Sequence, residues 1–130
     1  MNLAELYDAI GDALRVIPEV VAGDWQVLDA PYDAFDPPAL VVVGANPFGE
    51  ARSVCADMAQ YEVLVLAARL TPEATYPALI GMIDTVRNEL ADARLRPASY
   101  TAPGPVEVAS ITYLGARLLI RRPVDIEGDT

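Results

Sequence analysis

The segment Tyr61–Leu70 constrains the fold of this chain more than any other. Its sequence is Tyr-Glu-Val-Leu-Val-Leu-Ala-Ala-Arg-Leu, and its charged residues, Glu62 and Arg69, stand near opposite ends. A short apolar run of this kind is typical of a strand that is covered on both faces. We therefore expect Tyr61–Leu70 to lie in the centre of a sheet. Ala39–Val43, a second short apolar run that is ended by Gly44, is expected to be another buried strand.

Two amphipathic helices are expected beside these strands. Residues 2–16 begin with Asn2 as N-cap and Glu5 three residues later, and Pro18 follows the end of the helix. Its apolar face consists of Leu3, Leu6, Tyr7, Ile10 and Leu14. The second helix opens at Thr71-Pro72-Glu73, or at Pro77 with Thr75 as its cap, and continues to Leu90. Gly81 and Asp84 are weak points, and the helix can break in two near Asp84.

The remaining elements are short. A strand is expected at Trp25–Leu28, and Gly44–Asp57 is expected to be a long exposed loop because it holds turn formers and little periodicity. Val106–Tyr113 and Ala116–Arg121 are expected to pair as a hairpin that turns around Gly115.

The order of these elements is helix, optional strand, two strands, helix and two strands, which predicts an α+β fold. We expect a single, mostly antiparallel sheet of four to five strands, with the N-terminal helix and the central helix packed on one face. A chain of 130 residues fits one domain. We assign that domain to residues 1–122 and expect residues 123–130 to be a polar C-terminal tail, because Pro123 ends the strand ladder.

The charge of the chain argues against nucleic acid as a partner. It has 19 acidic residues against 9 basic ones, a formal net charge of −10, and all of the basic residues are Arg. Such a charge repels a phosphate backbone, so we expect no sequence-specific nucleic-acid binding. No apolar run approaches the roughly 18 to 20 residues that cross a bilayer, and no signal-peptide pattern begins the chain, so no membrane partner is expected.

The residue inventory excludes most catalytic chemistry. There is no His and no Lys, and Cys55 is the single Cys, so His-based acid–base pairs, Schiff bases and zinc clusters are ruled out. No Gly-rich phosphate loop is present. Asp29, Asp33 and Asp36 match no calcium-loop spacing, and we interpret them as a solvated acidic loop. We expect no metal, no cofactor and no enzymatic activity; a small enzyme that depends on carboxylates alone is the alternative of a different class.

Two polar segments are expected to contact other subunits. The predicted loop Gly44–Asp57 and the end of the chain, Arg121–Thr130, are interrupted by Pro or Gly, yet both hold apolar or Arg side chains suited to an interface. The candidate interface residues are Phe48, Arg52, Val54, Arg121, Arg122, Val124 and Ile126. Residues 1–60 hold ten acidic and two basic residues, whereas residues 61–130 hold nine and seven, an asymmetry that suits complementary faces in a head-to-tail contact.

Several short motifs resemble a known family. They are Leu-Tyr-Asp-Ala in the first helix, Phe35-Asp36-Pro37-Pro38-Ala39-Leu40-Val41-Val42, Tyr61-Glu62-Val63-Leu64-Val65, and Asp84-Thr85-Val86-Arg87-Asn88-Glu89-Leu90. Over residues 1–122 the chain resembles the tail terminator and head-to-tail connector proteins of long-tailed (siphovirus-type) phages, especially those of actinobacteria. The all-Arg basic composition fits a GC-rich host of that kind.

The resemblance implies a structural virion protein. Such a subunit forms a homo-oligomeric ring, a hexamer, that caps the tail tube, stops its polymerisation and joins it to the head-closure or connector protein. Its partners would be the tail tube protein and the head connector, and it would be found at the tail top or neck after assembly in the host cytoplasm. A neck head-closure or head–tail adaptor protein is the alternative. The family offers no catalytic residues to carry over.

Overall fold

The computed structural model describes residues 1–28, 36–52, 56–71 and 76–125. In chain order the elements are α1 Leu3–Arg15, α2 Pro18–Val21, β1 Gln26–Leu28, β2 Ala39–Ala51, β3 Ala56–Arg69, α3 Tyr76–Asp92, β4 Ser99–Tyr100, β5 Gly104–Val108 and β6 Ile111–Asp125. Their succession confirms the predicted α+β class. None of the described helices is long and apolar enough to span a membrane.

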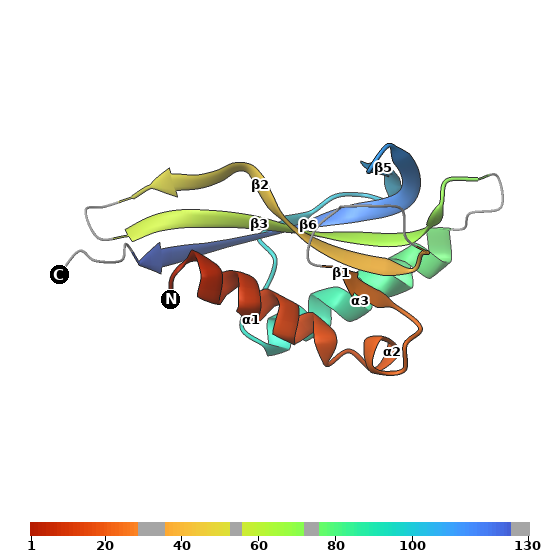
Figure 1. Ribbon diagram of the computed structural model, residues 1–130, viewed down its shortest axis with the longest axis horizontal. Coiled ribbons are helices and arrows are strands. Elements are labelled where there is room, and N and C mark those ends of the chain that lie inside the picture. Colours follow the sequence, from red (N-terminus) through yellow and green to blue (C-terminus); the bar gives the residue numbers. More distant parts are fainter. Residues whose placement is uncertain (29–35, 53–55, 72–75, 126–130) are drawn as a thin grey trace.

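One mixed sheet organises the molecule (Figure 1). Its strand order is β1-β2-β3-β6-β4, and β5 pairs with the first part of β6, so the sheet has six strands rather than the four to five predicted. β1 lies parallel to β2, and all other pairs are antiparallel. β3 lies between β2 and β6 along most of its length, which confirms the central position predicted for Tyr61–Leu70.

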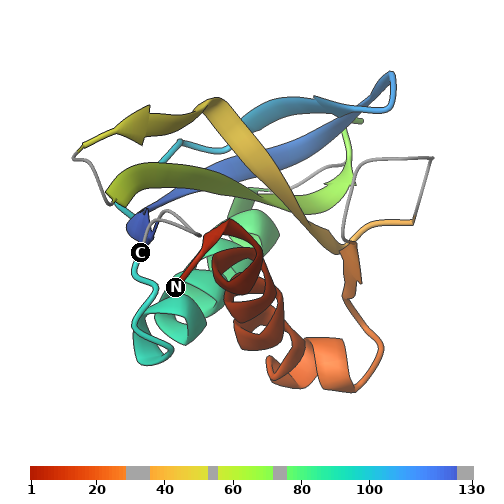
Figure 2. The ribbon, with the colours of Figure 1, turned by 60° about the vertical axis from the view of Figure 1, so that its left-hand side comes forward.

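The helices α1 and α3 cover one face of this sheet (Figure 2). Alternate residues of β3 and β6 point toward them and form the larger core with the apolar faces of both helices. Leu6, Ile10 and Leu14 of α1 are fully buried in this core, as the helical spacing predicted. Asn2 and Glu5 form the expected capping box, in which Glu5 N donates to Asn2 Oδ1 at 2.8 Å and Asn2 N donates to Glu5 Oε1 at 3.0 Å.

A hairpin of β5 and β6 builds a smaller core on the opposite face of the sheet (Figure 1). This second core contains Val41, Leu64, Leu66, Val106, Val108 and Tyr113. The turn consists of Ala109 and Ser110, with φ angles of 51° and 68°, the positive pair that a type I′ hairpin turn requires.

The predicted turn at Gly115 is therefore wrong, because Gly115 lies inside β6. The residue is small for a packing reason: a Cβ at this position would stand 2.6 Å from the carbonyl oxygen of Val65 on the neighbouring strand.

The helix α3 runs without a break through Gly81 and Asp84, contrary to the break that these residues predicted. Its buried face holds it against the sheet, and Arg87 pairs with Asp84 at 2.6 Å on the exposed side. The predicted helix start, Thr71-Pro72-Glu73, extends into residues outside the described part of the chain. At the other end Arg94 adopts φ 63°, and Leu95 N donates to Leu90 O at 2.7 Å, so the helix ends in a Schellman motif with Arg in the position usually taken by Gly.

The three longest strands extend together past the N-terminus of α1 (Figure 1). We call this end of the sheet the outer arm: residues 45–51 of β2 with the adjoining Arg52, 56–60 of β3 and 121–125 of β6. The arm overturns two predictions. Most of Gly44–Asp57 is strand rather than loop. Residues 123–125 are the end of β6 rather than part of a polar tail, since Pro123 pairs with Met58 and Val124 with Asp57.

Pro123 pairs with Met58, and the β3–β6 ladder continues past it to Asp125. Pro123 therefore does not end the strand. The domain boundary predicted at residue 122 therefore moves at least to Asp125, and residues 126–130 lie outside the described part.

Candidate subunit interface

A large bulge in β2 shapes the outer arm. Gly44 pairs with Tyr61 and Gly49 pairs with Ala59, so residues 45–48 of β2 stand opposite a single residue of β3, Gln60. Gln60 is only 7% exposed, and its side-chain Nε2 donates to the carbonyl oxygen of Pro47 at 2.7 Å. The bulge is thus held by a partly buried hydrogen bond from the buried Gln60 side chain.

The bulge brings Phe48 back over the sheet. Its ring lies against Gly44, where a Cβ would stand 2.8 Å from Phe48 Cδ1, and it meets the Tyr61 ring edge-on with centroids 5.0 Å apart. Phe48 nevertheless remains 42% exposed. The sequence prediction that Phe48 is available for an interface therefore agrees with its exposure, although its ring is also anchored within the chain.

Tyr61 connects the bulge to the start of α1. Its hydroxyl donates to the carbonyl oxygen of Leu3 at 2.9 Å, and its ring centroid lies 5.8 Å from that of Tyr7. Burial raises the pKa of Tyr61 above its ordinary value of 10.0, and Tyr7 and Asp8 raise it further. We call Leu3, Tyr7, Asp8 and Phe48, the residues around Tyr61, the α1 surface; Leu3 is 41% exposed, and Asp8 is exposed at its edge.

The opposite face of the outer arm has no helix over it and is rich in arginine. Arg52 and Arg121 share one carboxylate oxygen, Glu50 Oε2, at 3.6 and 3.9 Å. Farther along the same face Arg117 pairs with Glu62 at 3.3 Å. Strand alternation and register place two partly buried apolar side chains among these charges. We call the set the arginine surface: Glu50, Arg52, Met58, Glu62, Arg117, Leu119 and Arg121.

The pairing on the arginine surface is incomplete. Arg121 Nε is buried, and it has no hydrogen-bond partner among the described residues. Glu50 carries one charge for two guanidinium groups, and both distances exceed those of a good charge-assisted hydrogen bond. The three arginines face two carboxylates, so the surface has a local positive excess on a chain with a net charge of −10.

Two candidate interface residues act inside the chain instead. Arg122 Nη2 donates to the carbonyl oxygens of Arg94 and Arg96 at 3.0 and 3.4 Å and so ties the end of α3 to β6. Val124, which the sequence predicted as an interface residue, is 4% exposed and belongs to the larger core. Val54 and Ile126 lie outside the described residues, and their role stays a prediction.

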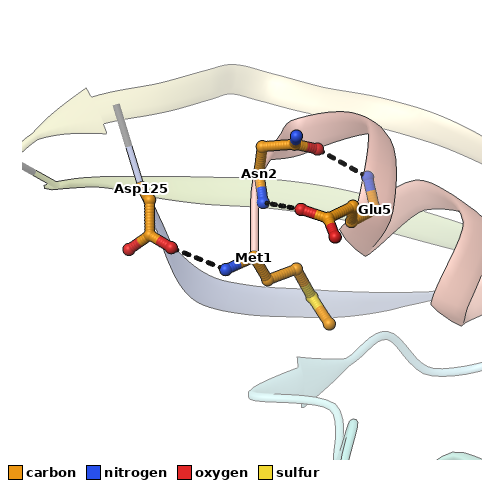
Figure 3. A network of polar contacts seen from close by, with 4 residues as sticks. All are labelled: Met1, Asn2, Glu5 and Asp125. Carbon is orange, nitrogen blue, oxygen red and sulfur yellow. Dashed lines mark hydrogen bonds and ion pairs between the residues drawn. The ribbon is translucent and has the colours of Figure 1, made fainter. Parts of the chain in front are cut away.

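The beginning of the chain is tied to the end of β6 (Figure 3). The amine of Met1 donates to Asp125 Oδ2 at 2.6 Å, and Asp125 N donates to Met1 O at 2.9 Å. The hydrogen bond to Asp125 raises the pKa of this amine. Met1 thus lies beside β6 on the edge away from β3, and the contact fixes the arm relative to α1.

Two hollows adjoin the arm. A polar one of about 230 Å³ lies on the helix-free face and is lined by Ala45, Asn46, Gln60, Glu62, Ser99, Thr101, Arg117 and Leu119. A larger apolar one of about 620 Å³ lies between α1, the end of α3 and β6. Among the described residues no group of three or more His, Cys, Asp or Glu side chains is arranged to hold a metal ion.

No protein-family model matches this sequence, and a search of curated proteins finds no similar sequence. The functional conclusion therefore depends on the geometry of the outer arm and on the resemblance of the short motifs.

Proposed function

We propose that this chain is a structural subunit that assembles with copies of itself, and that it acts as a tail terminator, a ring that caps a phage tail tube and joins it to the head connector. The observation that carries the proposal is a pair of unlike surfaces at and beside the outer arm, on opposite faces of the sheet. One is apolar with an acidic edge, and the other is rich in arginine. Unlike surfaces on one subunit suit a head-to-tail contact, which closes into a ring when the rotation between copies allows it.

The α+β fold and the motif resemblance support the same role. An arm fixed by the Gln60 hydrogen bond, the Tyr61 hydrogen bond and the Met1 contact is a suitable interface element, since a preorganised surface loses little conformational entropy on binding. The carboxylates that line the polar hollow or lie near it do not support the alternative of a carboxylate-dependent enzyme. Glu50 and Glu62 each face an arginine rather than a second carboxylate.

Removal of this chain from particle assembly tests the proposal and separates it from the alternatives. A missing terminator leaves the tail tube free to grow, so we expect tails that exceed the normal length by electron microscopy and heads without tails. Supplying the wild-type chain should restore tails of uniform length. Normal-length tails that fail to join heads would instead indicate the neck adaptor alternative. Intact, infectious particles made without the chain would contradict any structural role.

A further inference from the structure

We propose that the arginine surface of one copy binds the α1 surface of the next copy, with Arg52 and Arg121 around the Asp8 carboxylate of the neighbour. This inference rests on the proposed function in that it names the surfaces through which the subunits of the ring meet. The occupant of the arginine surface is thus a second copy of this chain.

The arginine surface has fewer carboxylates than its guanidinium groups can bind. Two guanidinium groups share the single carboxylate of Glu50 at 3.6 and 3.9 Å, and Arg121 Nε is buried without an acceptor among the described residues. The Arg52 and Arg121 side chains are 52% and 36% exposed, so a second carboxylate from outside the chain can accept from the exposed parts of both guanidinium groups, which Glu50 alone does not satisfy. Arginine is also the residue best suited to a charged contact at an interface, since its planar fork binds carboxylates in a defined geometry.

The α1 surface offers an exposed carboxylate, that of Asp8. Asp8 is exposed, lies close enough to Tyr61 to raise its pKa, and has no ion-pair partner among the described residues. Leu3 and Phe48, which contact Tyr61, are 41% and 42% exposed. A surface that holds one acidic group and two exposed apolar side chains complements a surface on which Arg52 and Arg121 surround the partly buried Met58.

The placement of the two surfaces allows the contact to repeat from copy to copy. They lie on opposite faces of the sheet, the arginine surface on the face without helices and the α1 surface at the start of α1, so one copy can engage two neighbours at once and repeat the same contact. The small number of residues involved predicts a weak contact between free copies, which a tail tube that presents several copies together would strengthen.

Reversing the charges on each of the two surfaces tests the contact directly. We expect the wild-type chain to self-associate in sedimentation experiments between about 10 µM and about 1 mM, where weak contacts are populated. The association should weaken when the salt rises from about 50 to about 500 mM, because ions screen exposed charges. The Arg52→Glu/Arg121→Glu variant and the Asp8→Arg variant should each associate at least about tenfold more weakly than the wild type, since like charges then meet.

A mixture of the two variants gives the decisive measurement. In an equimolar mixture every contact between unlike copies has opposite charges again, so association should return to near the wild-type level. Matched controls are Arg69→Glu/Arg96→Glu and Asp24→Arg, which make the same charge changes at exposed positions away from both surfaces. The controls should associate like the wild type. If the reversal unfolds the arm, Arg52→Gln/Arg121→Gln carries the test, because it removes the charges without adding acids.

Three outcomes would overturn the inference. They are a wild-type chain that stays monomeric throughout, variants that associate as well as the wild type, and a mixture of variants that stays monomeric. Wild-type association that none of these substitutions weakens would refute the assigned surfaces but leave the terminator proposal intact. Normal tails made without the chain would refute the terminator proposal even if the contact between copies were confirmed.

Discussion

The two ends of the central sheet differ in how their faces are covered. At the end that carries the β5–β6 hairpin both faces are covered, and Leu66 and Tyr113 are fully buried on the face away from the helices. In the outer arm the same face of the same strands has no cover, and the side chains of Glu50 and Arg52 are 46% and 52% exposed. The covered end therefore holds the fold together, whereas the open end leaves side chains exposed, and these are the side chains that we propose contact a neighbouring copy.

The largest expected effect lies at the covered end. Leu66→Ala removes a fully buried side chain from the smaller core and should destabilise the domain by about 2 to 5 kcal/mol. Met58→Ala, on the same face of β3 but in the outer arm, should cost less than about 1 kcal/mol because Met58 is partly exposed. Denaturant unfolding of both variants measures the difference. Equal losses for the two would break the comparison between the ends.

A pair of glycines sharpens the comparison within the covered end. Gly115→Ala forces a Cβ to within 2.6 Å of the Val65 carbonyl oxygen and should cost about 1 to 3 kcal/mol. Gly81→Ala, in α3 with no atom within 4 Å of the added Cβ, should instead stabilise the domain by about 0.5 to 1 kcal/mol. The midpoints of thermal unfolding should move in opposite directions, and a midpoint that does not fall in Gly115→Ala would show that the close approach at Gly115 is not limiting.

Val124 tests how far the core reaches into the outer arm. Since Val124 is 4% exposed in the larger core, Val124→Ala should cost about 1 to 2 kcal/mol in chemical denaturation. Pro123→Ala is the matched control on the exposed side of the same strand and should have little effect. The sequence alone predicted that the domain ends at residue 122 and that residues 123–130 are a polar tail; a Val124→Ala variant as stable as the wild type would restore that interpretation.

The smallest effect concerns Tyr61, which joins the bulge to α1. Tyr61→Phe removes the hydrogen bond to Leu3 O and should cost about 1 kcal/mol near neutral pH. The folded pKa of Tyr61 is raised, so its contribution is fully present below the unfolded pKa of 10.0 and is lost as the pH rises through the folded value. Stability measured against pH should therefore fall less steeply above pH 10 in Tyr61→Phe. Identical slopes would show that Tyr61 ionises equally in both states.

Much of the fold follows from local patterns. The capping box of α1, the central position of β3 and the α+β class were predictable, because capping residues and apolar periodicity act over a few residues. The hairpin turn at Ala109 and Ser110 was missed because neither residue is a usual choice for positive φ. Gly115 suggested a turn, although its role is to allow a close approach of β6 to β3, which depends on a distant strand.

The candidate site was only partly predictable, because it too depends on contacts between segments that are distant in the sequence. The exposure of Phe48, Arg52 and Arg121 agrees with the predicted interface positions, whereas Tyr61, Gln60 and Asp8 were not among the candidates. Their roles arise from pairing across β2, β3 and α1. A signal was present in the spacing of Gly44, Pro47 and Phe48, since a Gly and an aromatic residue around a Pro favour a bulge over a strand end.

A map of the assembled particle at side-chain resolution tests the central claim most directly, because it shows where the chain lies and what its outer arm touches. We expect a closed hexameric ring at the head-proximal end of the tail tube, with Arg52 and Arg121 of each copy against Asp8 of the next. A dodecameric ring beside the portal, or copies whose outer arms face solvent, would contradict it.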